Sequence, residues 1–235
     1  MTLTMRRAIL RREHAGGLRA MDTEVIRSKR KQALRRAVDV LKRGGLVAFP
    51  TDTVYGVAAM VWDAEAVRRL YAAKERPEDR AIPVLLSDAD LLVRVATLPD
   101  RFEHQVELLV NRFWPGGLTL VLPKVEAVPD VVTNGPSVAV RLPDLDLARR
   151  LIREAGGVLA VTSANLSDQP SPRTARDVVE QLGGRVELIV DGGSCRGGVA
   201  STVLDCTTSP PAILRQGAVS EDALRAVIGR VETRP

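Results

Sequence analysis

The sequence has few of the residues that several common kinds of protein site require. Its 235 residues include two cysteines and two histidines, too few for a disulfide framework or a zinc-binding set. No apolar run approaches the roughly 20 residues of a membrane-spanning helix, and the first 20 residues lack the continuous apolar stretch of a secretory signal. We therefore expect no membrane span and a reducing compartment, the cytoplasm.

Two phosphate-binding loops are also absent. The chain contains neither Gly-x4-Gly-Lys-Ser/Thr nor Gly-x-Gly-x-x-Gly, so the sequence supports neither a P-loop nor a Rossmann site. His104 lies within a predicted helix and His14 near the N-terminus, positions that do not suggest a Ser-His-Asp site. We expect chemistry that uses no histidine base and no structural metal.

The net charge of +5 is unevenly distributed. Residues 1–31 hold nine basic and three acidic side chains, a net charge of +6, which leaves the rest of the chain near −1. The basic excess therefore belongs to the N-terminal part and says little about the partners of the remaining chain. We expect a flexible basic extension over residues 1–27, followed by one domain over residues 28–230.

Predicted helices and strands alternate along that domain. The apolar spacing predicts helices over residues 28–43, 64–73, 89–96, 101–113, 145–155 and 175–182, with a last helix capped by Ser220. Short apolar runs predict strands over residues 46–49, 82–86, 118–122, 138–142, 158–162, 186–190, 202–205 and 212–215. Because several strands follow one another with no helix between them, we expect a single α/β domain with a mixed sheet.

Polar and basic residues cluster where the predicted strands end, and they are the candidate site. They are Thr51, Asp52, Thr53, Tyr55, Lys74, Arg76, Arg141, Ser163, Asn165, Ser201, Thr202 and Arg215. In open α/β sheets, ligands bind in the crevice outside the strand ends. Four cations with hydroxyl and amide donors suit a polyanion.

Each candidate also has a structural interpretation. Lys74 could complement the dipole of its own helix, and Arg141 could pair with Asp144. Asp52 could bond to nearby backbone in an ordinary turn. The glycine pairs at residues 192–193 and 197–198 could either cradle a phosphate through their amides or form a flexible turn.

Taken in order, these segments resemble the YrdC/Sua5 family of L-threonylcarbamoyladenylate synthases, in its short single-domain form. The resemblance extends over residues 30–228 and rests on seven motifs: FPTDTVYG (49–56), KERP (74–77), FWPGGLT (113–119), VRLP (140–143), SAN (163–165), STV (201–203) and RQG (215–217). It implies a YrdC-like twisted mixed sheet with helices around a basic cleft.

The resemblance also implies an activity, that of a nucleotidyltransferase. Members of the family combine L-threonine, bicarbonate or CO2, and ATP into threonylcarbamoyl-AMP and pyrophosphate. A downstream threonylcarbamoyl transferase complex then modifies adenosine 37 of tRNA. Mg2+ is expected with the ATP, without a dedicated protein ligand set.

Motif positions imply the site residues. Three are expected to bind L-threonine: Thr53, Arg141 and Ser163. Six are expected to bind ATP, the first two of them as the catalytic pair: Lys74, Arg76, Arg80, Asn165, Ser201 and Arg215. The sequence departs from the usual family pattern at Arg80, Leu85 and Arg173.

Two other functions are compatible with parts of the sequence. A non-catalytic protein that binds double-stranded RNA or tRNA would need clustered basic residues, which the N-terminal part supplies. However, the rest of the chain is nearly neutral, and its seven aromatic residues form no interleaved stacking surface. A domain that transfers a carbamoyl group to another protein would carry zinc-finger and accessory segments, which this sequence lacks.

Overall fold

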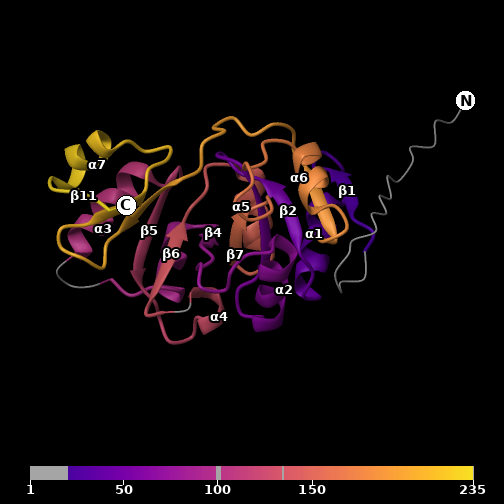
Figure 1. Cartoon of the computed structure of the whole chain (residues 1–235), viewed down its shortest axis with the longest axis horizontal. Helices are drawn as coiled ribbons and strands as arrows, with labels where there is room; N and C mark the ends of the chain where they lie inside the picture. The colour runs from indigo at the N-terminus through magenta and orange to yellow at the C-terminus, as the bar shows by residue number, and fades with distance from the viewer. Residues whose placement is uncertain (1–20, 99–101, 134, 235) are drawn as a thin grey trace, which may run out of the picture.

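The structure is a computed structural model that describes residues 21–98, 102–133 and 135–234. Its described residues form one sheet of eleven strands in the order β1-β8-β2-β3-β7-β4-β6-β5-β9-β10-β11 (Figure 1). Neighbouring strands pair in both directions, for example β1 with β8 in parallel and β2 with β3 antiparallel. The predicted α/β class and mixed sheet are confirmed.

The strands of this sheet are β1 (Glu24–Arg27), β2 (Val47–Pro50), β3 (Tyr55–Met60), β4 (Val84–Leu86), β5 (Leu118–Pro123), β6 (Ser137–Arg141), β7 (Val158–Ser163), β8 (Leu188–Asp191), β9 (Thr202–Asp205), β10 (Ala212–Arg215) and β11 (Glu232–Thr233). The helices are α1 (Ala33–Lys42), α2 (Ala64–Lys74), the 3-10 helix η1 (Ala89–Arg94), α3 (Glu103–Phe113), α4 (Asp130–Thr133), α5 (Asp146–Glu154), α6 (Ala175–Leu182) and α7 (Glu221–Ile228). Helices α3 and α7 lie at the opposite end of the molecule from α1 and β1 (Figure 1).

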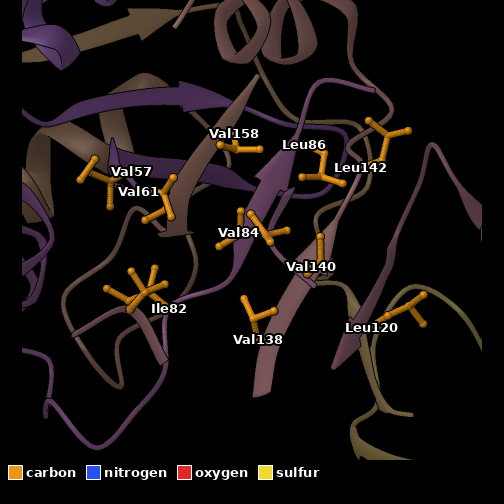
Figure 2. Close-up of a cluster of buried hydrophobic side chains, with 14 of the residues drawn as sticks. Val57, Val61, Ile82, Val84, Leu86, Leu120, Val138, Val140, Leu142 and Val158 are labelled. Atoms are coloured by element: carbon orange, nitrogen blue, oxygen red, sulfur yellow. The ribbon is translucent and has the colours of Figure 1, made fainter. Parts of the chain in front are cut away.

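Helices cover the two faces of the sheet unequally. On one face, α1 and α5 pack on β2, β3, β4, β7 and β8 and share one buried cluster with them. On the other face, the remaining helices enclose a larger cluster, in which valine and leucine side chains of β3 to β7 meet (Figure 2). Burial of each such side chain contributes roughly 1.5–3 kcal/mol, so this second face carries most of the core.

The strand register shows which site residues lie on the face that α1 and α5 occupy. Leu85 belongs to their buried cluster and pairs with Arg141 of β6, and directly paired residues point to the same side of a sheet. The register of β5 with β6 places Thr119 opposite Arg141. Thr119 pairs with Val203, and Val203 pairs with Arg215. The face that α1 and α5 cover over the first strands therefore continues onto β6 and β5, where it carries the buried polar side chains of Arg141 and Thr119.

Helix α2 carries one of the candidate cations at its last residue. It begins at Asp63, whose Oδ1 accepts hydrogen bonds from the amides of Glu65 and Ala66, as an N-cap does. It ends at Lys74, because Glu75 adopts the left-handed conformation with φ 51°. The predicted cap and length of this helix are confirmed.

Several sequence predictions differ from the structure. The domain begins earlier than residue 28, because residues 24–27 form β1 and pair with β8; residues 1–20 of the predicted extension lie outside the described residues. The predicted helix over residues 28–43 begins only at Ala33, since Gln32 provides no side-chain cap. Strand β3 was not expected, because Gly and Ala, which are rare in strands, occupy three of its six positions.

Within the described ranges, every helix is too short or too polar to cross a membrane.

Candidate functional site

The turn between β2 and β3 is closed by Thr51. Its Oγ1 donates to the Val54 carbonyl at 2.7 Å and accepts from the amides of Thr53 and Val54 at 3.2 and 3.3 Å. The expectation that Asp52 bonds to nearby backbone is therefore wrong. Because Thr51 serves the turn, the carboxylate of Asp52 is available for a partner from another strand.

That partner is Arg141, at the end of β6. Its Nη2 donates to Asp52 Oδ1 at 2.5 Å, its Nη1 to Thr53 Oγ1 at 2.9 Å, and its Nε to the Gly116 carbonyl at 2.8 Å. Asp144, the partner suggested by sequence proximity, is not the one that the structure shows. Burial lowers the pKa of Arg141, and the Asp52 carboxylate opposes this shift. The guanidinium is thus fixed on three sides, and one N–H on each terminal nitrogen remains for a ligand.

Lys74 is almost completely buried, with 1% of its surface exposed. Its Nζ donates to the Ser163 carbonyl at 2.5 Å and to the Asn165 carbonyl, both at the end of β7. Lys74 lies in the last turn of α2, where a cation complements the helix dipole, but both hydrogen bonds of its ammonium group join it to the end of β7. Burial, and to a lesser extent the charge of Arg76, lowers the pKa of Lys74 to about 7. Both partners of the ammonium group are neutral carbonyls, so no carboxylate in the described part of the chain balances its charge. A bound anion would supply that balance.

Arg215 and Ser201 form the far side of the site. The Nη2 of Arg215 donates to the carbonyl of Ser201 at 2.9 Å and to its Oγ at 3.1 Å. Ser201 Oγ also lies 2.8 Å from Thr119 Oγ1. Burial lowers the pKa of Arg215, and the charges of Arg141 and Arg76 lower it further. These two residues are therefore close enough to the predicted L-threonine and phosphate residues to belong to one site.

Arg76 and Arg80 follow α2 in one loop but differ in exposure. Arg76 donates from Nε to the Arg80 carbonyl at 3.0 Å and from Nη2 to the Ala81 carbonyl at 2.9 Å, and burial lowers its pKa. Arg80 is exposed and pairs with Asp168 at 2.8 Å. The half-buried Arg76 therefore lies near Lys74 and Arg215, and Arg80 lies at the edge of the site, where Asp168 already balances its charge.

Asn165 presents one unused acceptor in a buried position. Its Nδ2 donates to the carbonyls of Leu166 and Gln169 at 2.7 and 2.8 Å. Its Oδ1 is buried and has no hydrogen-bond partner among the described residues. An unpaired buried acceptor is costly, so a ligand that donates a hydrogen bond at this position would stabilise the site.

The cations of the site repel one another. The pKa of Lys74 is lowered by Arg76, and that of Arg215 by both Arg76 and Arg141. A nearby like charge disfavours the charged form of each group. A ligand with several negative charges would relieve this repulsion, so the arrangement favours a polyanion.

The glycine pairs do not cradle a phosphate. The amides of Gly197 and Gly198 donate to the carbonyls of Asp52 and Thr53 at 3.0 and 2.8 Å. The amide of Gly193 donates to Asp191 Oδ1 at 3.0 Å. Because protein groups occupy these amides, the phosphate-cradle interpretation is wrong.

The two other departures from the family pattern have defined positions. Leu85 is buried in the cluster beneath α1 and α5, so it lines the apolar core. A Cβ on Gly198 would lie 2.8 Å from the guanidinium carbon of Arg173, which places Arg173 against the glycine-rich segment. The sequence motifs contain Asp52 and Gly116, but they did not predict that either residue is a hydrogen-bond partner of Arg141.

The site is rich in cations and poor in metal ligands. The described residues contain no group of three or more His, Cys, Asp or Glu side chains arranged to hold a metal ion. The carboxylate of Asp52 already contacts Arg141. These residues fit a divalent ion that arrives on the phosphates of a nucleotide, and they do not form a resident metal site.

Comparisons with known proteins agree with the geometry. A family model for Sua5, YciO and YrdC proteins, described as "Telomere recombination", matches residues 39–217. Threonylcarbamoyl-AMP synthase of Pyrococcus abyssi is 43% identical over 203 residues, which cover 86% of this chain and 59% of that protein. The Bacillus subtilis enzyme of the same name is 42% identical over 200 residues, covering 84% and 57%.

A solved structure is similar as well. The crystal structure of P. abyssi Sua5 with L-threonine has a TM-score of 0.85 and 41% identity, covering 92% of this chain and 63% of that one. The chain thus spans less than two thirds of the length of these relatives. The matched residues include all seven motifs, from Phe49 to Gly217. The chain therefore belongs to the Sua5/YciO/YrdC family.

Proposed function

We propose that this protein is a threonylcarbamoyl-AMP synthase. It would convert L-threonine, bicarbonate and ATP into threonylcarbamoyl-AMP, pyrophosphate and water. The carrying observation is one group of side chains in which the hydrogen-bonded pair of Arg141 and Thr53 shares the site with Lys74, which is buried, and with the more accessible Arg76 and Arg215. Relatives named threonylcarbamoyl-AMP synthase, and a related structure that holds L-threonine, support it.

The amino-acid subsite is assigned to the Arg141 side of the cluster. The two free N–H groups of Arg141 would bind the carboxylate of L-threonine as a fork, with the Thr53 hydroxyl beside them. Ser163, at the end of β7, would lie near the amine or the carbamate formed on it. This subsite holds the reactant still and leaves its nitrogen free to react with CO2.

The nucleotide subsite is assigned to the other cations. Lys74 and Arg76 would bind the phosphates, with Arg80 at the edge, while Asn165, Ser201 and Arg215 would contact the rest of the nucleotide. A carbamate oxygen attacks the α-phosphorus, the bond to the β-phosphate oxygen breaks, and pyrophosphate leaves. No protein nucleophile is needed; positioning and stabilisation of negative charge supply the rate.

MgATP is the form of the nucleotide that we expect as substrate, with the metal held by the phosphates. The product carries a reactive mixed anhydride, so a transferase acting on tRNA would consume it. That partner, and a cytoplasmic location, follow from the family reaction.

The test is pyrophosphate release by the purified protein from MgATP, with L-threonine and bicarbonate each present or omitted. We expect release that requires both compounds. Release that is independent of either one would contradict the proposal. Absence of release, together with RNA binding by the same preparation, would favour the RNA-binding alternative.

A further inference from the structure

The segment over residues 192–198, here called the strap, joins two parts of the sheet that lie far apart in strand order. It leaves β8, near one end of the sheet, and leads to β9, near the other; Figure 1 shows it in orange, passing from the α6 side of the molecule toward the strands on the opposite side. On the way it contacts the turn between β2 and β3. None of the seven family motifs includes a residue of the strap.

Hydrogen bonds attach the strap to this turn at two places. At its start, the Gly192 amide donates to Tyr55 Oη at 3.2 Å, and that hydroxyl donates to the Gly193 carbonyl at 2.7 Å. At its end, the Gly197 and Gly198 amides donate to two consecutive carbonyls of the turn, those of residues 52 and 53. The strap and the turn therefore form one unit.

Only glycine permits this approach at residue 197. A Cβ there would lie 2.7 Å from the Asp52 carbonyl oxygen and 3.2 Å from Thr53 Cα. The first of these distances is closer than real Cβ atoms come to backbone, so a larger residue would push the strap and the turn apart. The requirement comes from contact with the turn, which makes Gly197 a specific probe of the contact.

The two residues that the strap holds by their carbonyls are also the two whose side chains orient Arg141. Asp52 accepts from Nη2 of Arg141 and Thr53 accepts from its Nη1. The strap is therefore connected to the Arg141 guanidinium by two short routes, one through Asp52 and one through Thr53. In each route, a single residue of the turn contacts both the strap and Arg141.

We propose that the strap is a positioning element for the amino-acid carboxylate subsite, with Asp52 and Gly197 as its key residues. Asp52 sets the orientation of the Arg141 fork, and Gly197 sets the position of Asp52. This inference deepens the proposed function and rests on its assignment of Arg141. It makes the strap part of the selection of the amino acid, separate from the nucleotide side of the site.

The first measurements are KM values for L-threonine and ATP in Asp52 variants. Asp52→Ala removes a hydrogen bond to a charged group, so we expect the KM for L-threonine to rise by about 10- to 100-fold while that for ATP stays within about twofold. Asp52→Asn keeps an oxygen that can accept from Nη2, so its KM should lie between those of the wild type and Asp52→Ala. Equal effects on both substrates would overturn the role in orienting Arg141.

Gly197→Ala tests the strap itself, with Gly183→Ala as the matched control. A Cβ at Gly183 would lie 2.5 Å from the Val179 carbonyl oxygen, at the end of α6, so both changes create a similar clash. We expect both to lower Tm, and only Gly197→Ala to raise the KM for L-threonine. If the two variants lose Tm equally and neither changes that KM, the strap is merely structural.

A double variant and a binding measurement complete the test. In Asp52→Ala with Gly197→Ala, the effects on the KM for L-threonine should not add, because both act on the same path; additive effects would overturn the path through Asp52.

Calorimetric titration of L-threonine separates this inference from the proposed function. If the wild type binds L-threonine without turnover, the proposed function fails and the Kd values of the variants decide the inference. If the wild type binds none, both fail.

Discussion

Lys74 shows at the level of one residue how burial prepares a site for an anion. Its ammonium group is bonded to two neutral carbonyls and lies near Arg76, and its pKa falls to about 7. Near neutral pH, a substantial share of the molecules therefore has an uncharged amine at this position. A bound phosphate would favour the charged form, so binding of the nucleotide at pH 8 should be accompanied by proton uptake.

Lys74→Met should remove activity without unfolding the protein. Methionine fills a similar space but gives no charge to the phosphates, so we expect pyrophosphate release to fall by at least about 100-fold. Tm should change little, because removal of a buried charge offsets the loss of the hydrogen bonds to the Ser163 and Asn165 carbonyls. The matched control is Lys124→Met, which removes a lysine paired with Asp130 and should retain full turnover. Undiminished release by Lys74→Met would disprove the phosphate role.

Arg141→Lys should affect one substrate far more than the other. A lysine cannot make the three hydrogen bonds that fix Arg141 and still present a fork to a carboxylate. We expect the KM for L-threonine to rise by about 10-fold or more, and the KM for ATP to change little. Steady-state kinetics with each substrate varied in turn would measure both values. The reverse pattern would show that the two subsites are exchanged.

At the level of elements, α2 connects a surface cap to a buried catalytic candidate. Asp63 caps the first turn of α2, and Lys74 is its last residue. Asp63→Ala should lower the free energy of unfolding by about 0.5–2 kcal/mol, measured by urea denaturation. Asp63→Asn keeps an acceptor and should lose less. Both variants should retain the wild-type KM for ATP, since packing on the sheet still places Lys74; a large rise would mean that the cap itself orients the lysine.

The same elements show what sequence could and could not predict. The bounds of α2 and α6 and the cap at Ser220 agree with local signals, because caps and apolar spacing depend on neighbours in the chain. Strand β3 was missed because its small residues gain their strand conformation from pairing with β2 and β7. The ion pair of Arg141 with Asp52 joins residues 89 positions apart, a contact that only the sheet order creates.

For the molecule as a whole, the site is a source of instability that pH can reveal. The unfolded chain protonates Lys74 with its ordinary pKa of 10.5, whereas the folded chain does so at about 7. Between these two values the unfolded state binds more protons than the folded state. The free energy of unfolding contributed by this group therefore rises with pH through that window, by at most about 1.4 kcal/mol per pH unit, and stays constant below it.

Comparison of the wild type with Lys74→Met isolates this contribution. Urea denaturation at pH 6, 7, 8 and 9 should show that the stability of the wild type rises relative to the variant above about pH 7, with no relative change below. The measurements stop before pH 10, because burial raises the pKa of Tyr55 above its ordinary value. Above pH 10, Tyr55 would ionise in the unfolded chain but not in the folded one, and this difference would lower the free energy of unfolding. Lys42→Met, at an exposed helix end, should run parallel to the wild type. If Lys74→Met also runs parallel, Lys74 is charged in the free protein, and its ammonium group is already balanced before any phosphate binds.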